Sequence, residues 1–172
     1  MAKAGPQLPS LPTLASGTLI RVGCDAVAIH EMPEHRRLVA FRDVGRGTHL
    51  FKIEGRETAV ATRYSIQVGA GLHLDPDVGL NEAERLQRTY WRFLDHACEP
   101  SVRIRDRVVI AVRDIAEGEA VTFHYCTTEY DMASPFACRC GSPRCMGTVR
   151  GARHLTPAQR KPLEKWMPDY LR

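Results

Sequence analysis

Three cysteines near the end of the chain have the spacing of metal ligands. Cys138, Cys140 and Cys145 form a C-x-C-x4-C pattern inside the stretch "FACRCGSPRCMG". Thiolates bind Zn²⁺ well, and a closed structural zinc site takes four ligands in a tetrahedron. The pattern therefore needs a fourth ligand from elsewhere in the chain. From the residues alone, the candidates are Cys24, Cys98, Cys126 and the seven histidines.

The composition is that of one ordinary globular domain. Of 172 residues, 44% are hydrophobic and 26% are charged, which is enough to bury a core. The chain has no apolar run of membrane-spanning length and no signal-peptide core. We therefore expect no membrane partner, a cytoplasmic location (or a nuclear one in a eukaryote), and cysteines that serve metal or reactive chemistry. A net charge of +4 does not indicate direct nucleic-acid binding.

The elements that must position the cysteines are mostly short strands. The apolar and alternating runs predict strands over 38–44, 48–55, 64–75 and 119–125, and a hairpin over 102–115 that turns at Asp106-Arg107. Helices are predicted over 80–94 and 156–171. In the second helix, Thr156 can cap the N-terminus and Pro157 can occupy the first turn. The sequence thus predicts a mostly β fold with a few helices.

One pattern occurs twice along the chain. "VAFRDVGRGTHL" (39–50) and "IAVRDIAEGEAV" (110–121) share the order apolar, Ala, apolar, Arg, Asp, apolar and, three positions later, Gly. Two equivalent strand–turn–strand elements would explain the pattern, with a glycine of positive φ in each turn. Chance similarity of strand composition is the alternative.

Three motifs around the cysteines resemble those of a known family. The stretch "RFLDHACEPS" (92–101) resembles R-F-x-N-H-S-C-x-P-N, and "AEGEAVTFHY" (116–125) resembles G-E-E-L-T-F-D-Y. "CRCGSPRCMG" (138–147) resembles a C-x-C-x4-C post-SET segment. Their order, together with "FRDVGRGTHLFKIEG" (41–55), makes residues 35–150 similar to the SET-domain protein lysine methyltransferases.

The resemblance implies a fold and a metal site. The fold would be a SET domain, β-clip-like with short curved sheets, followed by a post-SET zinc segment and a helical tail. The implied boundaries are a flexible leader over 1–17, the SET-like catalytic domain over 18–134, the zinc segment over 135–151 and the tail over 152–172. In such proteins the cysteine of N-H-S-C joins the post-SET thiolates. The implied Zn²⁺ ligands are Cys98, Cys138, Cys140 and Cys145.

The resemblance also implies a reaction and the residues that perform it. The reaction is methyl transfer from S-adenosylmethionine, most directly to the amine of a lysine-bearing peptide, in a channel that cofactor and acceptor enter from opposite faces. Tyr125 matches the tyrosine at their meeting point, where it would position the reacting groups. Arg92, Asp95 and His96 match the segment that contacts the cofactor. Phe123 stands where Phe or Tyr sets how many methyl groups fit, and it hints at more than one.

Several residues depart from the pattern of the family. His35-Arg36-Arg37 stands where members carry G-x-G before the first strand, and Ile53 replaces a tyrosine. Asp95 replaces the Asn of N-H-S-C, and three further replacements are Ala97, Ser101 and His124. Three hypotheses follow: a protein lysine methyltransferase, a SET-fold enzyme acting on a small molecule, or a binding module that has lost catalysis. The retained Tyr125 favours the two enzymes.

Overall fold

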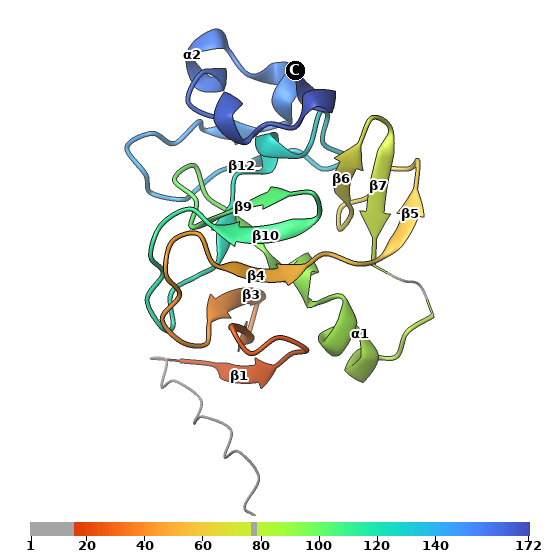
Figure 1. Ribbon diagram of the computed structural model, residues 1–172, viewed down its shortest axis with the longest axis vertical. Helices are drawn as coiled ribbons and strands as arrows, with labels where there is room; N and C mark the ends of the chain where they lie inside the picture. The colour runs from red at the N-terminus through yellow and green to blue at the C-terminus, as the bar shows by residue number, and fades with distance from the viewer. Residues whose placement is uncertain (1–15, 77–78) are drawn as a thin grey trace, which may run out of the picture.

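The computed structural model describes residues 16–76 and 79–172 (Figure 1). In chain order the strands are β1 (Thr18–Arg21), β2 (Val27–Met32), β3 (His35–Ala40), β4 (His49–Lys52), β5 (Arg56–Thr58), β6 (Ile66–Gly69), β7 (Leu72–Asp75), β8 (Asp95–His96), β9 (Val102–Arg105), β10 (Val108–Ala111), β11 (Thr122–Phe123), β12 (Phe136–Ala137) and β13 (Thr148–Val149). The α-helices are α1 (Glu82–Arg88) and α2 (Pro157–Arg160). Single 3-10 turns are η1 (Tyr90–Phe93), η2 (Tyr125–Thr127), η3 (Ala152–His154), η4 (Glu164–Trp166) and η5 (Asp169–Leu171). Residues 1–15 of the predicted leader lie outside the described residues.

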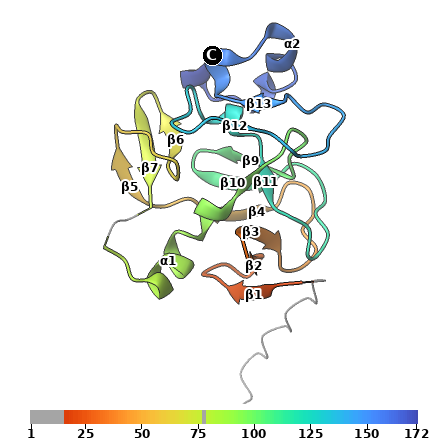
Figure 2. The same cartoon turned by 180° about the vertical axis from the view of Figure 1, so that it is seen from behind.

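Small sheets make up most of the fold, which confirms the predicted class. The three-stranded sheets have the orders β1-β2-β3, β4-β10-β9 and β5-β7-β6, and two-stranded sheets pair β11 with β8 and β12 with β13. Figures 1 and 2 show the β4-β10-β9 sheet between the N-terminal sheet and the C-terminal tail. A main core joins these layers, and its fully buried members include Ile29, Leu38, Trp91 and Val109. No helix in the described ranges is long and apolar enough to cross a membrane.

The repeated pattern forms two equivalent elements, as predicted. The backbone of Val44 exchanges two hydrogen bonds with that of Ile115, each 2.9 Å long. The N–H of Gly47 donates to the carbonyl of Ala111, and the N–H of Gly118 donates to that of Ala40. Both glycines have positive φ, at 87° and 80°. The two copies therefore hold each other by matching bonds across a local two-fold relation.

The second copy also builds the surroundings of the predicted site. The hairpin of β9 and β10 turns at Asp106 and Arg107, which have φ of 51° and 65°; this confirms the predicted turn. Beyond it, β11 pairs in parallel with β8, so that Phe123 lies opposite His96. This pairing brings two motifs that are distant in sequence side by side. The predicted strand over 119–125 is shorter than expected, because the chain bends into η2 at Tyr125.

Both predicted helices are wrong in length. The helix over 80–94 ends as α1 at Arg88, since Thr89 bonds back to the carbonyl of Arg85 and the chain tightens into η1, which buries Trp91. The helix over 156–171 is α2 followed by single turns, because Pro162 and Pro168 lack the N–H that a continuing helix needs.

The C-terminal tail instead packs through apolar side chains. Leu163, Met167 and Leu171 are buried in a second core with Cys126 and Val149. This core lies beyond the cysteine-rich segment, at the blue end of Figure 1.

The predicted strand over 64–75 is a hairpin of β6 and β7 that turns at Gly71, whose φ is 63°.

Candidate active site and metal centre

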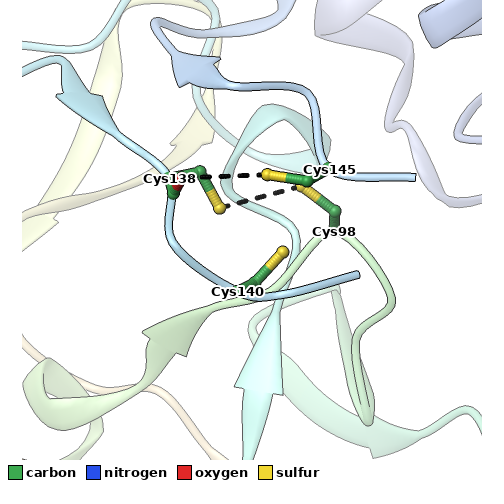
Figure 3. A group of neighbouring side chains, drawn as sticks. All are labelled: Cys98, Cys138, Cys140 and Cys145. Carbon is green, nitrogen blue, oxygen red and sulfur yellow. Dashed lines mark hydrogen bonds between the residues drawn. The ribbon is translucent and has the colours of Figure 1, made fainter. Parts of the chain in front are cut away.

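Four cysteines meet where the tail joins the domain. Cys98 follows β8, Cys138 and Cys140 follow β12, and Cys145 precedes β13. Their sulfur atoms lie within 4.8 Å of one another and point toward a common centre (Figure 3). The structure thus brings together all four residues that the resemblance implied as ligands. Cys24 and Cys126 are not part of the cluster.

The geometry and chemistry of this cluster fit a Zn²⁺ ion. Four sulfurs at 2.3 Å from a tetrahedral Zn²⁺ would lie about 3.8 Å from each other, and Cys98 Sγ lies 3.9 Å from Cys138 Sγ. Burial raises the pKa of the Cys98 thiol, and the neighbouring sulfurs raise it further. A bound cation would supply the charge that keeps such thiols deprotonated. The cluster is therefore consistent with a post-SET zinc site.

His96 connects the cysteine cluster to Tyr125. Its Nδ1 accepts a hydrogen bond from the backbone N–H of Tyr125 at 3.2 Å, so Nε2 carries the proton in the neutral ring. That Nε2 lies 3.4 Å from Cys98 Sγ. Burial, and then the neighbouring His124, lower the pKa of His96 to about 3. A neutral ring therefore donates to one predicted ligand and accepts from the residue that matches the family's active-site tyrosine.

The residues predicted to bind cofactor line one large cleft. This large cleft has a volume of about 1250 Å³ and lies between the β2–β3 turn, the 92–97 segment and the 134–140 segment. Arg92, Asp95 and His96 all line it, as does Tyr125. The structure brings these four residues together, as the motif order predicts.

Tyr125 stands at the boundary between two hollows. Its hydroxyl donates a hydrogen bond to the carbonyl of Leu94 at 2.7 Å. Its ring packs on Phe123, with centroids 4.6 Å apart, and on His96, at 5.2 Å. Burial, with Asp95 and Glu129 nearby, raises the pKa of the phenol above its ordinary value of 10. A phenol held in this way is a poor proton acceptor near neutral pH, although its hydroxyl oxygen can still accept a hydrogen bond.

The second hollow is a small cavity of about 50 Å³. It shares seven lining residues with the large cleft, among them Tyr64, Arg92, Leu94 and Tyr125, and its other lining residues include Trp91, Phe123 and Glu129. Four aromatic residues and two arginines are among its fourteen lining residues, and one of the fourteen carries a carboxylate. The large cleft and the small cavity thus adjoin along a shared wall that includes Tyr125.

Two of the departures from the family pattern contact each other. His35 Nε2 lies 2.8 Å from Asp95 Oδ2, and both residues line the large cleft. Three further replacements lie in the interior: Ile53 and Ser101 are fully buried, and His124 is 4% exposed with its Nδ1 unpartnered among the described residues. The replacements therefore lie in two places, at the wall of the large cleft and in the interior of the domain.

Sequence reasoning missed three residues of this site. The family pattern identifies His35 only as a departure, and it contains neither Tyr64 nor Glu129. Tyr64 packs under Arg92, whose Cζ lies 4.4 Å from the ring centroid. Tyr64 and Glu129 lie outside the recognised motifs, and the one signal for Glu129 is an acidic residue in the run "YCTTEY" (125–130).

The chain is similar to known methyltransferases in sequence and in fold. The sequence profile of the SET domain matches residues 13–126. Methyltransferase flvH from Aspergillus flavus is 31% identical over 99 residues, which cover 55% of this chain and 49% of flvH. Histone-lysine N-methyltransferase ATX2 from Arabidopsis thaliana is 29% identical over 147 residues, 81% of this chain and 11% of ATX2. The chain thus spans about half the length of flvH and a small part of ATX2.

Solved structures have the same fold at low sequence identity. KRYPTONITE, crystallised with mCHG DNA and SAH, superposes with a TM-score of 0.52 at 18% identity, over 69% of this chain and 27% of that one. The methyltransferase domain of human SETMAR gives 0.51 at 15% identity, over 70% of this chain and 56% of that one. At such identities the likeness concerns the fold alone.

Proposed function

The chain belongs to the SET-domain family, and from this premise we propose that it transfers methyl groups from S-adenosylmethionine to an aliphatic amine, most directly a protein lysine. The observation that carries the proposal is the meeting of the large cleft and the small cavity at Tyr125. A methyl transfer is an in-line displacement, so donor and acceptor must approach one point from two sides. Two adjoining hollows with Tyr125 in their shared wall provide that geometry.

We assign the large cleft to the cofactor. When bound, S-adenosylmethionine would supply an electrophilic methyl group on a sulfonium. Arg92, Asp95 and His96 line the cleft, and the backbone of the 95–96 strand is fixed by its pairing with β11. The segment is therefore rigid enough to orient a ligand without reorganising.

We assign the small cavity to the amine. Its aromatic walls would exclude water, and they suit both an aliphatic stem and a cationic amine. Tyr125 would orient the reacting nitrogen through its hydroxyl, which Leu94 already holds in place. Phe123 is buried beside it and carries no hydroxyl, which leaves room for a second methyl group.

The zinc site would have a structural role in this proposal. Cys98 belongs to the domain body and the other three thiolates belong to the following segment, so the metal would pin that segment against the large cleft. Cys138 and Cys140 themselves line the large cleft. Loss of the metal would therefore loosen one wall of the cofactor site.

A small-molecule amine is the second candidate acceptor. The names of the relatives differ in the acceptor that they state. ATX2 is named a histone-lysine N-methyltransferase, whereas flvH is named a methyltransferase with no acceptor given. The small cavity would take the terminal amine of either kind of acceptor. The methyl acceptor would therefore be either a protein or a small molecule, and neither acceptor requires the chain to bind DNA directly.

The test has a binding step and a transfer step. Isothermal titration of the full chain with S-adenosylmethionine and S-adenosylhomocysteine should give saturable binding. Methyl transfer is then followed with core histones, free lysine and short alkylamines. No cofactor binding would refute the proposal and favour the hypothesis of a binding module, and transfer to alkylamines but not to histones would favour the second candidate.

A further inference from the structure

A buried carboxylate, that of Glu129, lies in the wall of the small cavity. Glu129 follows η2 and is 8% exposed, and it lines the small cavity together with Tyr125, Trp91 and Phe123. Carboxylates are rarely buried without a cationic partner, because taking a charge out of water is costly. No ion pair joins Glu129 to any Lys, Arg or His in the part of the chain that the structure describes.

The hydrogen bonds of Glu129 involve one oxygen only. The backbone N–H of Gln67 donates to its Oε1 at 2.8 Å, and the hydroxyl of Thr128 lies 3.3 Å from the same atom. Within residues 16–76 and 79–172, Oε2 has no hydrogen-bond partner. The side chain is thus fixed at one oxygen, while the other is available to a ligand in the small cavity.

The groups that face Glu129 do not neutralise it. The charge of Glu129 acts on Tyr125, Cys126 and Tyr170. A phenol or a thiol is either neutral or negatively charged, so none of the three can balance a carboxylate. Arg63 and Arg92 line the same cavity, but they stack on the ring of Tyr64, at 5.9 and 4.4 Å from its centroid. An aromatic cavity with one unpaired carboxylate is complementary to a cation with an aliphatic stem.

We propose that Glu129 binds the ammonium group of the acceptor and takes its proton, leaving the neutral amine that attacks the methyl group. The inference rests on the proposed function. An N–H bond of the ammonium breaks, and the proton passes to a carboxylate oxygen of Glu129. The freed lone pair then forms the N–C bond while the C–S bond of the sulfonium breaks, and the sulfur keeps that electron pair. Glu129 later releases its proton to water.

The acidity of Glu129 suits this role. Burial raises its pKa from 4.5 to about 7, against the hydrogen bonds from Gln67 and Thr128 that lower it. A base works best when its pKa lies near the operating pH. An ordinary lysine amine has a pKa of about 10.4 and is almost fully protonated at neutral pH, so a proton acceptor within reach has a clear purpose.

The first experiment measures binding without catalysis. The probes are n-pentylammonium, which mimics a lysine side chain, and n-pentanol, its uncharged counterpart. At pH 8 the wild type should bind the ammonium in preference to the alcohol, and Glu129→Gln should bind the ammonium at least tenfold more weakly. Glu57→Gln makes the same chemical change at an exposed residue paired with Arg107, and it should behave as the wild type. Equal ammonium affinity in Glu129→Gln and the wild type would overturn the proposal.

The second experiment measures transfer against pH. For the wild type, kcat/KM should rise with pH and show an inflection near 7, because only the ionised carboxylate accepts a proton. Glu129→Gln should lose roughly a hundredfold or more and should lose the inflection. A variant within twofold of the wild type, with the inflection retained, would show that another group takes the proton.

Two controls keep the outcomes separate. S-adenosylhomocysteine should bind Glu129→Gln as it binds the wild type, since Glu129 does not line the large cleft. A wild type that binds pentylammonium through Glu129 but no S-adenosylhomocysteine would refute the proposed function and not the ammonium site. If the variant does not fold, a ¹³C-carboxyl titration of the wild type decides: pentylammonium should lower the pKa of Glu129, and an unchanged pKa would overturn the inference.

Discussion

His35 Nε2 and Asp95 Oδ2 lie 2.8 Å apart at the large cleft, and both residues stand where the family pattern has another residue. A glycine is expected at the start of the strand and an asparagine in the second motif. The two replacements form one hydrogen-bonded pair that joins β3 to β8. This indicates that one departure accommodates the other at the wall of a cleft that is present in this chain.

Replacement of either partner should therefore weaken cofactor binding, and replacement of both should do little more. The variants are His35→Ala, Asp95→Asn and the double variant, and the measurement is S-adenosylhomocysteine affinity by titration. The pair is partly exposed, so each change should move the free energy of unfolding by less than about 1 kcal/mol. Effects that add fully in the double variant would show that the two residues act independently.

His96 should couple metal binding to the position of Tyr125. His96→Phe keeps a ring but removes the acceptor for the Tyr125 N–H and the donor near Cys98. We expect zinc affinity to fall by roughly 10- to 100-fold, as for other groups that orient metal ligands, and methyl transfer to fall as well. Competition with a zinc indicator dye measures the first effect. Unchanged zinc affinity together with slower transfer would separate the two functions of the ring.

One zinc ion per chain is expected in protein made with sufficient zinc. Cys98→Ser should lower the metal content and destabilise the C-terminal segment together, because Cys98 is the ligand that belongs to the domain body. Elemental analysis and limited proteolysis within 135–172 test both effects, with Cys24→Ser as a control outside the cluster. Wild-type protein that folds fully with little metal would contradict the zinc assignment.

The sequence predicted the parts of the site that depend on motif order. Cys98 lies 40 positions before Cys138, yet the family pattern predicted that both belong to one cluster of cysteines. The repeated pattern likewise predicted two equivalent turns with a glycine of positive φ in each. It did not predict that the two copies pair through Val44 and Ile115. The length of the first helix was beyond reach because burial of Trp91 in the turn that follows depends on the whole fold. The second helix is interrupted by Pro162 and Pro168, which the sequence does show.

The chemistry of the small cavity could not be read from the sequence. Folding removes Glu129 from water and places it in the same cavity as Tyr125, with no cationic partner among the described residues. The contact of His35 with Asp95 spans 60 positions and joins two residues that each looked like a loss. Such relationships arise from packing, whereas spacing within a motif reports only local geometry.

Tyr125→Phe should slow the reaction far more than it destabilises the protein. The ring and its packing on Phe123 remain, and the loss is the hydrogen bond to the carbonyl of Leu94, worth about 1 kcal/mol. Turnover should fall tenfold for each 1.4 kcal/mol of lost transition-state stabilisation. Melting temperature, cofactor affinity and kcat are compared with those of the wild type. A variant that methylates as fast as the wild type would remove Tyr125 from the mechanism.

Glu129→Gln should be more stable than the wild type at alkaline pH, although it is expected to be less active. Folding raises the pKa of Glu129 from 4.5 to about 7 because burial disfavours the charged form. The folded state favours the protonated carboxyl. The stability that comes with this protonated form is therefore fully present below pH 4.5, and it is lost as the pH rises through 7 and the buried group ionises. Above that, the wild type bears a cost on the order of 3 kcal/mol that an uncharged amide avoids, while the amide oxygen can still accept the hydrogen bond from Gln67.

Urea unfolding of the wild type and of Glu129→Gln at pH 5 and pH 8.5 measures this difference. The variant should gain stability relative to the wild type only at the higher pH, and Glu57→Gln should show no such change because its carboxylate is exposed. Using differences between variants cancels the titration of all other groups. A variant less stable than the wild type at pH 8.5 would mean that other groups of the protein already stabilise the negative charge of Glu129. Glu129 would then not need an ammonium group as a partner.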